Sequence, residues 1–169
     1  IIIGGVAGGA TTAARLRRMD ESCNITIYER GEHISYANCG LPYYIGEKIK
    51  EREKLFVQTP EAFFNRFKVN VKTNTEVIRI DRKNKKIVAK DVITGTTSED
   101  SYDKLVLSPG ASPVRPPIPG IDNEHIFTLR NVADTDRIKN FVETGNPKRA
   151  VIIGAGFIGL EMAENLHNK

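Results

Sequence analysis

The chain has 169 residues, of which 40% are hydrophobic and 27% are charged, and its formal net charge is +4. These values are ordinary for a globular protein and allow one full domain with part of a second. The basic residues fall in short stretches interrupted by acids, and no aromatic residues interleave with them at a recognisable motif spacing, so nucleic-acid binding is not expected. No apolar run approaches the ~20 residues of a membrane helix. The cysteines lack the spacing of a disulfide scaffold, which favours a cytoplasmic protein.

The N-terminal part predicts a strand–helix–strand unit. The apolar run Ile1–Ile3 reads as a strand and ends in a glycine-rich turn. An alanine-rich helix follows from about Gly8 to Met19, and Ile25–Tyr28 reads as the next strand. This order and length are typical of one βαβ unit.

A dinucleotide fingerprint overlaps this turn, although it is irregular. Gly4, Val6 and Gly9 occupy the three glycine positions of G-x-G-x-x-G, so a valine stands where the backbone must approach a pyrophosphate. Glu29 supports the fingerprint, because it ends the second strand 25 residues after Gly4, where an acid can bind a ribose hydroxyl. Without the glycines, Glu29 would be interpreted as a surface acid at a strand end.

Cys39 is the candidate redox residue. It lies in Ser35–Tyr44, a segment whose Ser, Asn and Gly content is unlike that of a core. Pro42 favours the first turn of a helix, which places Cys39 at a helix N-terminus, where the dipole stabilises a thiolate. The alternative is a small buried cysteine, which is how we interpret Cys23. Because no second cysteine follows nearby, Cys39 would react with a small-molecule thiol or cycle through a sulfenic acid or a persulfide.

The middle of the chain predicts a helix start, a hairpin and one further strand. Thr59 is suited to cap a helix whose first residue is Pro60. Polar and apolar residues alternate in Glu76–Asp81 and Lys86–Lys90, which predicts a hairpin in a small antiparallel meander. Leu105–Leu107 has the composition of a buried strand.

A domain boundary is predicted in Ser112–Gly120, where four prolines favour a stiff, extended connection. Residues 1–112 would form the first domain, and residues 113–169 the connection and the start of a second. A helix is expected over about Ala133–Glu143, ending at Gly145. Because the chain opens inside a predicted strand and ends inside a predicted helix, we expect it to be truncated, a piece of a longer protein.

A second fingerprint follows the apolar run Ala150–Ile153, which reads as a strand. Gly154, Gly156 and Gly159 match G-x-G-x-x-G before a predicted helix. An ordinary glycine-rich turn is the alternative. Two fingerprints imply two nucleotides: a nicotinamide donor, NAD or NADP, and a permanently held acceptor, for which FAD is the natural candidate.

Four segments together resemble the single-cysteine branch of the FAD-dependent pyridine nucleotide-disulfide oxidoreductases. They are Gly4–Ala10, Ser35–Gly46, Tyr102–Gly110 and Gly154–Glu161. The segment around Cys39 is most similar to the coenzyme A-disulfide and coenzyme A-persulfide reductases. The resemblance implies an α/β, Rossmann-like FAD/NAD(P)-binding fold of the glutathione-reductase type with a small antiparallel β-meander. It also implies NAD(P)H-dependent reduction of coenzyme A disulfide or persulfide, a small-molecule substrate, in a homodimer.

The resemblance assigns roles residue by residue, and none of them involves a metal. The positions that would bind FAD are Gly4, Gly5, Val6, Ala7, Gly9, Glu29, Arg30, Val77, Ser108, Gly110 and Arg130. Those of the nicotinamide dinucleotide are Gly154, Gly156 and Gly159, and those of the coenzyme A moiety are Thr11, Arg15, Arg18, Ser35 and Asn38. Arg15 and Arg18 share a helix face and could grip phosphates, although a solvated basic face is the alternative.

Two other functions remain open. An NADH oxidase or peroxidase would cycle through a Cys39 sulfenic acid, but the peroxidases and many oxidases of the branch carry a histidine where this chain has Ala7, which weakens this interpretation. A non-enzymatic flavoprotein that senses redox state through a partner is the second alternative, and no residue argues specifically for it.

Overall fold

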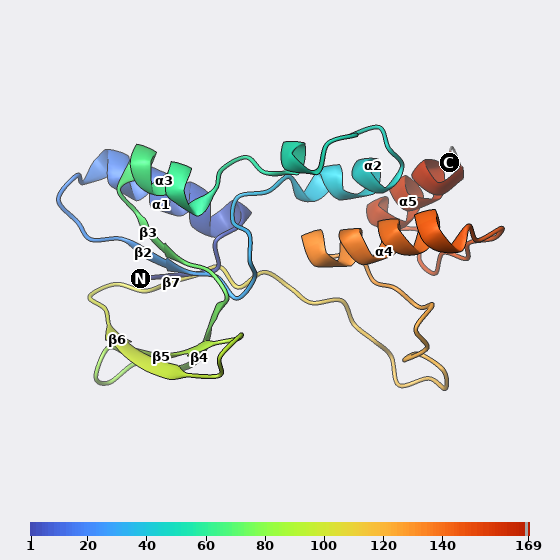
Figure 1. Cartoon of the computed structure of the whole chain (residues 1–169). Coiled ribbons are helices and arrows are strands. Elements are labelled where there is room, and N and C mark those ends of the chain that lie inside the picture. Colours follow the sequence, from blue (N-terminus) through green and yellow to red (C-terminus); the bar gives the residue numbers. More distant parts are fainter. Residues whose placement is uncertain (168) are drawn as a thin grey trace. The chain divides into compact units, whose positions relative to one another are not determined.

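The chain divides into two units that interleave in the sequence (Figure 1). The computed structural model describes residues 1–167 and 169. The first unit comprises residues 1–36 and 56–110, and the second comprises residues 37–55 and 111–169. The segment that contains Cys39 therefore belongs to the same unit as the C-terminal part of the chain.

A four-stranded parallel sheet forms the centre of the first unit. Because parallel neighbours end at the same edge, Gly4, Glu29 and Ser108, which directly follow three of the strands, come together there. The strand order is β3-β2-β1-β7, with β1 at Ile2–Ile3, β2 at Thr26–Tyr28, β3 at Asn70–Lys72 and β7 at Val106–Leu107.

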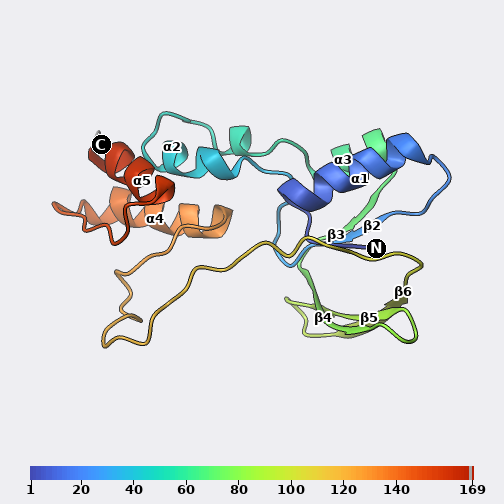
Figure 2. The same cartoon turned by 180° about the vertical axis from the view of Figure 1, so that it is seen from behind.

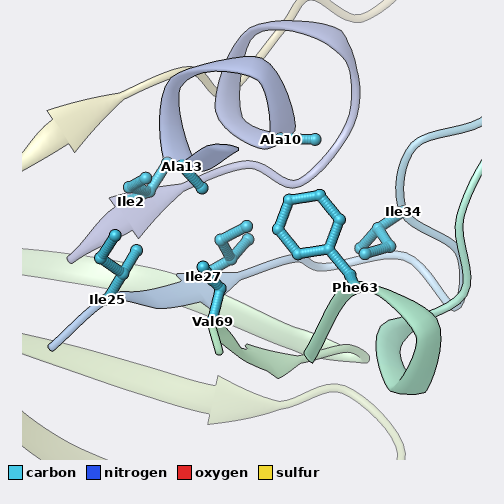
Figure 3. Packing of buried hydrophobic residues seen from close by; sticks show 8 residues of the cluster. All are labelled: Ile2, Ala10, Ala13, Ile25, Ile27, Ile34, Phe63 and Val69. Atoms are coloured by element: carbon cyan, nitrogen blue, oxygen red, sulfur yellow. The ribbon is translucent and has the colours of Figure 1, made fainter. Parts of the chain in front are cut away.

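Two helices, α1 (Ala7–Met19) and α3 (Pro60–Phe67), cover one face of this sheet (Figure 1). Small residues of α1 allow it to lie close to the strands, and the Phe63 ring of α3 fills the space beside them (Figure 3). The Thr59 hydroxyl accepts a hydrogen bond from the Ala62 N–H at 3.2 Å and so caps α3. The buried cluster consists of Ile2, Ala10, Ala13, Ile25, Ile27, Ile34, Phe63 and Val69.

An antiparallel meander lies against the opposite face, as Figure 2 shows from behind. It consists of β4 (Thr75–Asp81), β5 (Lys86–Asp91) and β6 (Thr97–Ser101), in the order β4-β5-β6. Tyr28 of the parallel sheet packs here against Ile87 and Ala89. The Tyr28 hydroxyl donates to Asp100 Oδ2 at 2.7 Å, so that a polar bond links the sheet to the meander.

The second unit is helical. The 3-10 helix η1 (Asn38–Gly40) leads directly into α2 (Leu41–Ile45), and α2 packs against both α4 (Val132–Gly145) and α5 (Phe157–His167). Its buried core is Ile45, Ile138 and Met162. A second 3-10 helix, η2 (Arg52–Leu55), is tied to α4 by Arg52, whose Nε donates to both carboxylate oxygens of Asp136 at 3.1 Å and whose Nη2 donates to Oδ2 at 2.8 Å. Within the described part of the chain, no helix combines the length and apolar character needed to cross a bilayer.

The predicted βαβ unit, hairpin, capped helix and C-terminal helices are confirmed, and so is the mixed α/β class with an antiparallel meander. One predicted strand is wrong. Residues 150–153 form no strand, because no described strand lies beside them to accept and donate the ladder hydrogen bonds. Val151 and Ile153 are accordingly 88% and 94% exposed. Conversely, β3 (Asn70–Lys72) was not predicted.

Candidate functional site

The turn between β1 and α1 brings backbone against backbone. Gly4 has a φ of +96°, a conformation that favours glycine, and its N–H donates to the Tyr28 carbonyl at 2.8 Å. A Cβ at Gly9 would collide with the carbonyl oxygen of Gly4, and a Cβ at Gly4 would collide with that of Ser108. The start of α1 therefore presents bare N–H groups beside the strand end, the arrangement that binds a pyrophosphate.

The second glycine turn repeats this geometry. Gly154 has a φ of +108°, and a Cβ at Gly159 would collide with the carbonyl oxygen of Gly154. The side chain of Ile152 lies 3.4 Å from that Cβ position, as the side chain of Ile2 lies 3.2 Å from the corresponding position at Gly9. The two fingerprints thus share one register. In this register Val6 occupies the position in the first turn that Gly156 occupies in the second. Val6 is the N-cap residue of α1.

Glu29 holds the turn from the next strand. Its Oε2 accepts a hydrogen bond from the Gly5 N–H at 2.7 Å, and its Oε1 accepts one from the Gly31 N–H at 2.8 Å. Its main chain bonds to Lys72 and Thr75, at 2.9 Å in both cases. The carboxylate is therefore fixed at the rim and keeps lone pairs for further donors.

A hollow of about 100 Å³, the Glu29 hollow, opens beside this carboxylate. Four of its lining residues were predicted from the sequence: Gly4, Glu29, Arg30 and Val77. Five were missed, because strand pairing brings them there: Ile3, Tyr28, Thr75, Glu76 and Pro109. The adenosine diphosphate half of FAD fits this site, which combines a glycine turn without room for a Cβ, an acid at the strand end and an adjoining hollow.

The other residues predicted for FAD in the first unit lie around the same turn. Gly5 is buried beneath it, whereas Ala7 is exposed in the first turn of α1. The Ser108 N–H donates to the Ile3 carbonyl at 2.8 Å, and the Ser108 hydroxyl faces Gly8. Gly110, with a φ of +71°, ends the unit.

Three residues predicted for coenzyme A share one face of α1. Thr11, Arg15 and Arg18 are all exposed and lie four and three residues apart. Arg17 points elsewhere, because its guanidinium donates to main-chain carbonyls at the ends of α1 and α3, including Phe67 at 2.8 Å. Ser35, also in this unit, donates its N–H to the Gly5 carbonyl at 3.0 Å and so lies next to the glycine turn.

Cys39 lies in η1, two residues before α2, as the proline pattern predicts. It is exposed and forms no disulfide, so the interpretation as a buried core cysteine is wrong. The neighbouring Asn38 has a buried Oδ1 without a hydrogen-bond partner in the described chain. A buried carbonyl oxygen of this kind is costly unless a donor reaches it, and Asn38 was predicted to contact coenzyme A.

A second hollow of about 340 Å³, the Cys39 hollow, is formed within the helical unit. Arg130 lies on its wall, held by hydrogen bonds from its N–H to Asp134 at 3.0 Å and from its Nε to the Ala111 carbonyl at 2.8 Å. Three of its lining residues were predicted as site residues, although in different roles: Asn38 for coenzyme A, Cys39 as the redox thiol and Arg130 for FAD. The lining residues that were missed are Leu41, Pro42, Leu129, Phe157, Ile158 and Glu161. Glu161 lies two residues after the last fingerprint glycine, and that spacing was the available signal.

The predicted residues thus fall into two groups. The first unit contains the first glycine turn and the face of α1 formed by Thr11, Arg15 and Arg18. The helical unit contains Asn38, Cys39, Arg130 and the second glycine turn. Gly154 and Gly156 are exposed and line neither hollow. No group of three metal-ligating side chains occurs among the residues that the structure describes.

Two dinucleotide-type turns and an exposed single cysteine define the class: an α/β protein of the Rossmann type built for nucleotide-linked redox chemistry. The whole chain, residues 1–169, matches the pyridine nucleotide-disulphide oxidoreductase family, and it belongs to that family. The predicted family and fold class are therefore confirmed.

Among known proteins, coenzyme A disulfide reductases and a persulfide reductase are similar to this chain in sequence or in structure. The coenzyme A disulfide reductase of Staphylococcus haemolyticus is 45% identical over 99% of this chain and 37% of its own. Reduced Bacillus anthracis CoADR-RHD has a TM-score of 0.95 at 54% identity, covering 99% of this chain and 30% of its own. A NAD-dependent persulfide reductase from A. fulgidus has a TM-score of 0.93 at 40% identity, with 99% and 31% covered. The chain spans little more than a third of the length of these curated relatives.

Proposed function

We propose that the protein is an NAD(P)H-dependent flavoprotein that reduces coenzyme A disulfide or coenzyme A persulfide through Cys39. The exposed Cys39 thiol carries this proposal, because it borders a hollow in a unit that contains no second cysteine. Without an internal partner the thiol is left to form a mixed disulfide with a small molecule. The similarity to coenzyme A disulfide reductases and to a persulfide reductase supports the same substrates.

FAD would be held by the first glycine turn and its surroundings. The N–H groups at the start of α1 would bind the pyrophosphate, and the Glu29 carboxylate would accept ribose hydroxyls. When bound, FAD supplies a two-electron carrier between the nicotinamide and a disulfide. The residues proposed to contact it are Gly4, Gly5, Val6, Ala7, Gly9, Glu29, Arg30, Val77, Ser108, Gly110 and Arg130. The second turn, Gly154, Gly156 and Gly159, would bind NAD or NADP.

Cys39 would exchange thiols in a balanced cycle. Its thiolate attacks one sulfur of coenzyme A disulfide, forms a Cys39–coenzyme A mixed disulfide and releases one coenzyme A thiolate, which takes up a proton. Two electrons and one proton, delivered from NAD(P)H, then cleave the mixed disulfide into the Cys39 thiolate and a second coenzyme A thiol. The sum is one disulfide, one NAD(P)H and one proton converted to two thiols and NAD(P)+.

Coenzyme A would be gripped through its phosphates and its thiol end. The guanidiniums of Arg15 and Arg18 are exposed on one face of α1, and such groups bind phosphates bidentately. Asn38 Oδ1 would accept a hydrogen bond from an N–H or O–H group of the bound coenzyme A, which would satisfy this orphaned oxygen. Thr11 and Ser35 complete the proposed contacts.

The full protein is further proposed to be a cytoplasmic homodimer. Residues 1–112 would be the first part of its FAD-binding domain, and residues 113–169 the connection and the start of its NAD(P)-binding domain. The resemblance to the single-cysteine branch supports both statements. Light scattering of the full-length protein would test the dimer, and a monomeric mass would contradict it.

Replacing Cys39 with Ser in the full-length protein tests the proposed chemistry. We expect NAD(P)H-dependent reduction of coenzyme A disulfide to be lost while the flavin absorbance stays, because serine cannot exchange thiols. Cys23→Ser is the matched control. Cys23 lies in the other unit, with its Sγ 3.2 Å from the Asp20 carbonyl, and its loss should leave turnover unchanged. Unchanged turnover in Cys39→Ser would refute the assignment.

A comparison of oxygen consumption with disulfide reduction separates the oxidase alternative, which one similar structure favours. A water-forming NADH oxidase from Lactobacillus brevis has a TM-score of 0.90 at 32% identity, covering 99% of this chain and 36% of its own. Oxygen consumption faster than disulfide reduction in the wild-type protein would favour that function. Ala7, where many oxidases of the branch carry a histidine, supports the disulfide reductase instead.

A further inference from the structure

Asn165 is a buried polar residue of α5. The residue is 0% exposed, and it lies three residues after Met162, a member of the helical unit's buried apolar cluster. Its Nδ2 donates to the Glu161 carbonyl at 2.8 Å, one turn earlier in α5. Its Oδ1 has no partner among the described residues. An unsatisfied buried carbonyl is costly, so an apolar residue would pack here more cheaply.

Gly46 explains where the orphaned oxygen lies. A Cβ at Gly46 would fall 2.5 Å from Asn165 Oδ1, 2.7 Å from its Cβ and 2.9 Å from its Cγ. Gly46 has φ −80° and ψ 9°, a conformation that any residue adopts, so glycine is needed for space and not for backbone freedom. The Asn165 amide therefore rests directly on the bare backbone that ends α2.

This Gly46–Asn165 contact joins the two helices that carry the Cys39 hollow. Gly46 ends the short helix that Cys39 precedes, and Asn165 lies on the helix that contributes Phe157 and Glu161 to the hollow. Cys39 and Glu161 are thus each connected to the contact by a few residues of helix. A shift of α5 against α2 at one end would move the wall of the hollow at the other.

We infer that Gly46 and Asn165 are positioning residues that set the approach of α5 to α2, and thereby the place of Phe157 and Glu161 opposite Cys39. The inference rests on the proposed function, in which Cys39 reacts at this hollow and the glycine turn that precedes α5 would bind NAD or NADP. Neither residue touches the reacting atoms. Their effect is on geometry, to which hydride and thiol transfer are sensitive at the scale of an ångström.

The test uses the full-length flavoprotein and the variants Gly46→Ala, Asn165→Ala and the double variant. Stopped-flow spectroscopy would measure the limiting rate constant for flavin reduction by NAD(P)H. We expect Gly46→Ala to lower it about tenfold with FAD content unchanged, because the added methyl displaces α5. Asn165→Ala in the same background should restore at least half of the rate, because removing the amide gives the methyl its space.

Gly145→Ala is the matched control, since its Cβ would meet only Phe141 at 3.8 Å, an ordinary contact. Hydrogen exchange of α5 gives a readout besides activity. Protection of residues 157–167 should fall in Gly46→Ala and return in the double variant. If Gly46→Ala does not fold, Asn165→Ser takes its place, because it removes the contact without a clash. We expect NAD(P)H to reduce the flavin of Asn165→Ser several-fold more slowly than that of the wild type.

A lower melting temperature with a wild-type rate constant in Gly46→Ala would overturn the inference, as would a double variant no faster than Gly46→Ala. Those results leave the proposed function standing. If NAD(P)H does not reduce the flavin of the wild-type protein, the proposed function is overturned, and the positioning role with it.

Discussion

The carboxylate of Glu29 accepts a hydrogen bond from the N–H of Gly5 at 2.7 Å and thereby clamps the first glycine turn to the end of the neighbouring strand. Gly5 is buried, so without the carboxylate this N–H loses its hydrogen-bond acceptor inside the protein. Glu29 is thus expected to act twice, as a support of the turn and as a proposed ligand of the ribose.

Replacing Glu29 with Ala should therefore weaken FAD binding by about 10-fold to 100-fold, the usual effect of losing hydrogen bonds to a charged group. The dissociation constant would be measured from the quenching of flavin fluorescence on titration of apoprotein. Glu32→Ala is the control, since that side chain is 74% exposed and its Oε2 lies 3.6 Å from His33 Nε2. Equal losses in the two variants would contradict a specific role for Glu29.

Two neighbouring arginines of α1 should separate stability from substrate binding. Arg17 donates to the carbonyls of Phe67 at 2.8 Å, Glu21 at 2.6 Å and Lys68 at 3.0 Å, so Arg17→Met should lower the free energy of unfolding by about 1–2 kcal/mol. Arg18 is exposed, and Arg18→Met should cost less than about 0.5 kcal/mol.

The coenzyme A assay should give the opposite order. Arg18→Met is expected to raise the KM for coenzyme A disulfide several-fold, because a phosphate contact is lost. Arg17→Met should leave that KM unchanged. Urea midpoints and initial rates on the same preparations check both halves, and a raised KM in Arg17→Met alone would contradict the assignment of the Arg15 and Arg18 face.

Local signals explain what the sequence could predict. The contact of Gly9 with the Gly4 carbonyl spans five residues, so glycine spacing alone identifies the turn. The strand Asn70–Lys72 is too short for an alternating pattern, and it is defined by pairing with β2 far earlier in the chain. The Cys39 hollow was only partly predicted for the same reason, because Phe157 and Glu161 reach it through helix packing and not through any motif around Cys39.

The error at residues 150–153 has the converse cause. Four consecutive apolar residues followed by a glycine turn have the composition of a buried strand. Composition, however, indicates only that the segment is suited to a strand. A strand also requires a neighbouring strand with which to form hydrogen bonds. The glycine turn that follows keeps its geometry without the ladder, since the contact between Gly159 and Gly154 is made within the turn itself.

A polar trio that links the parallel sheet to the meander should give a pH-dependent contribution to stability. Burial raises the pKa of Tyr28, and the hydrogen bond to the Tyr28 hydroxyl raises the pKa of Lys72. The hydrogen bond from Tyr28 lowers the pKa of Asp100. Lys72 Nζ lies 2.8 Å from the Tyr28 hydroxyl and 3.5 Å from Asp100 Oδ2.

The directions of these pKa shifts predict that the trio stabilises the fold most over a middle range of pH. The lowered pKa of Asp100 contributes stability above the usual aspartate value, about pH 4, and this is lost as the pH falls through the lowered pKa. The raised pKa values of Tyr28 and Lys72 contribute stability below about pH 10, which is lost as the pH rises through them. Tyr28→Phe should therefore destabilise most between these limits. Denaturant midpoints of both proteins across pH would check it, and a difference independent of pH would contradict the trio.

Adjacent glycines of α1 should respond oppositely to the same substitution. A methyl group at Gly9 would collide with the Gly4 carbonyl, a backbone atom that cannot rotate away. Gly9→Ala should therefore cost at least about 2 kcal/mol of unfolding free energy and lower the FAD content. A methyl group at Gly8 would meet the Ser108 hydroxyl, which can turn aside. Because alanine is favoured over glycine in a helix by about 0.5–1 kcal/mol, Gly8→Ala should be neutral or slightly stabilising. Thermal melts with flavin quantitation compare the two variants. A Gly9→Ala protein with the stability and the FAD content of the wild type would show that the turn is not the tight cradle that dinucleotide binding requires.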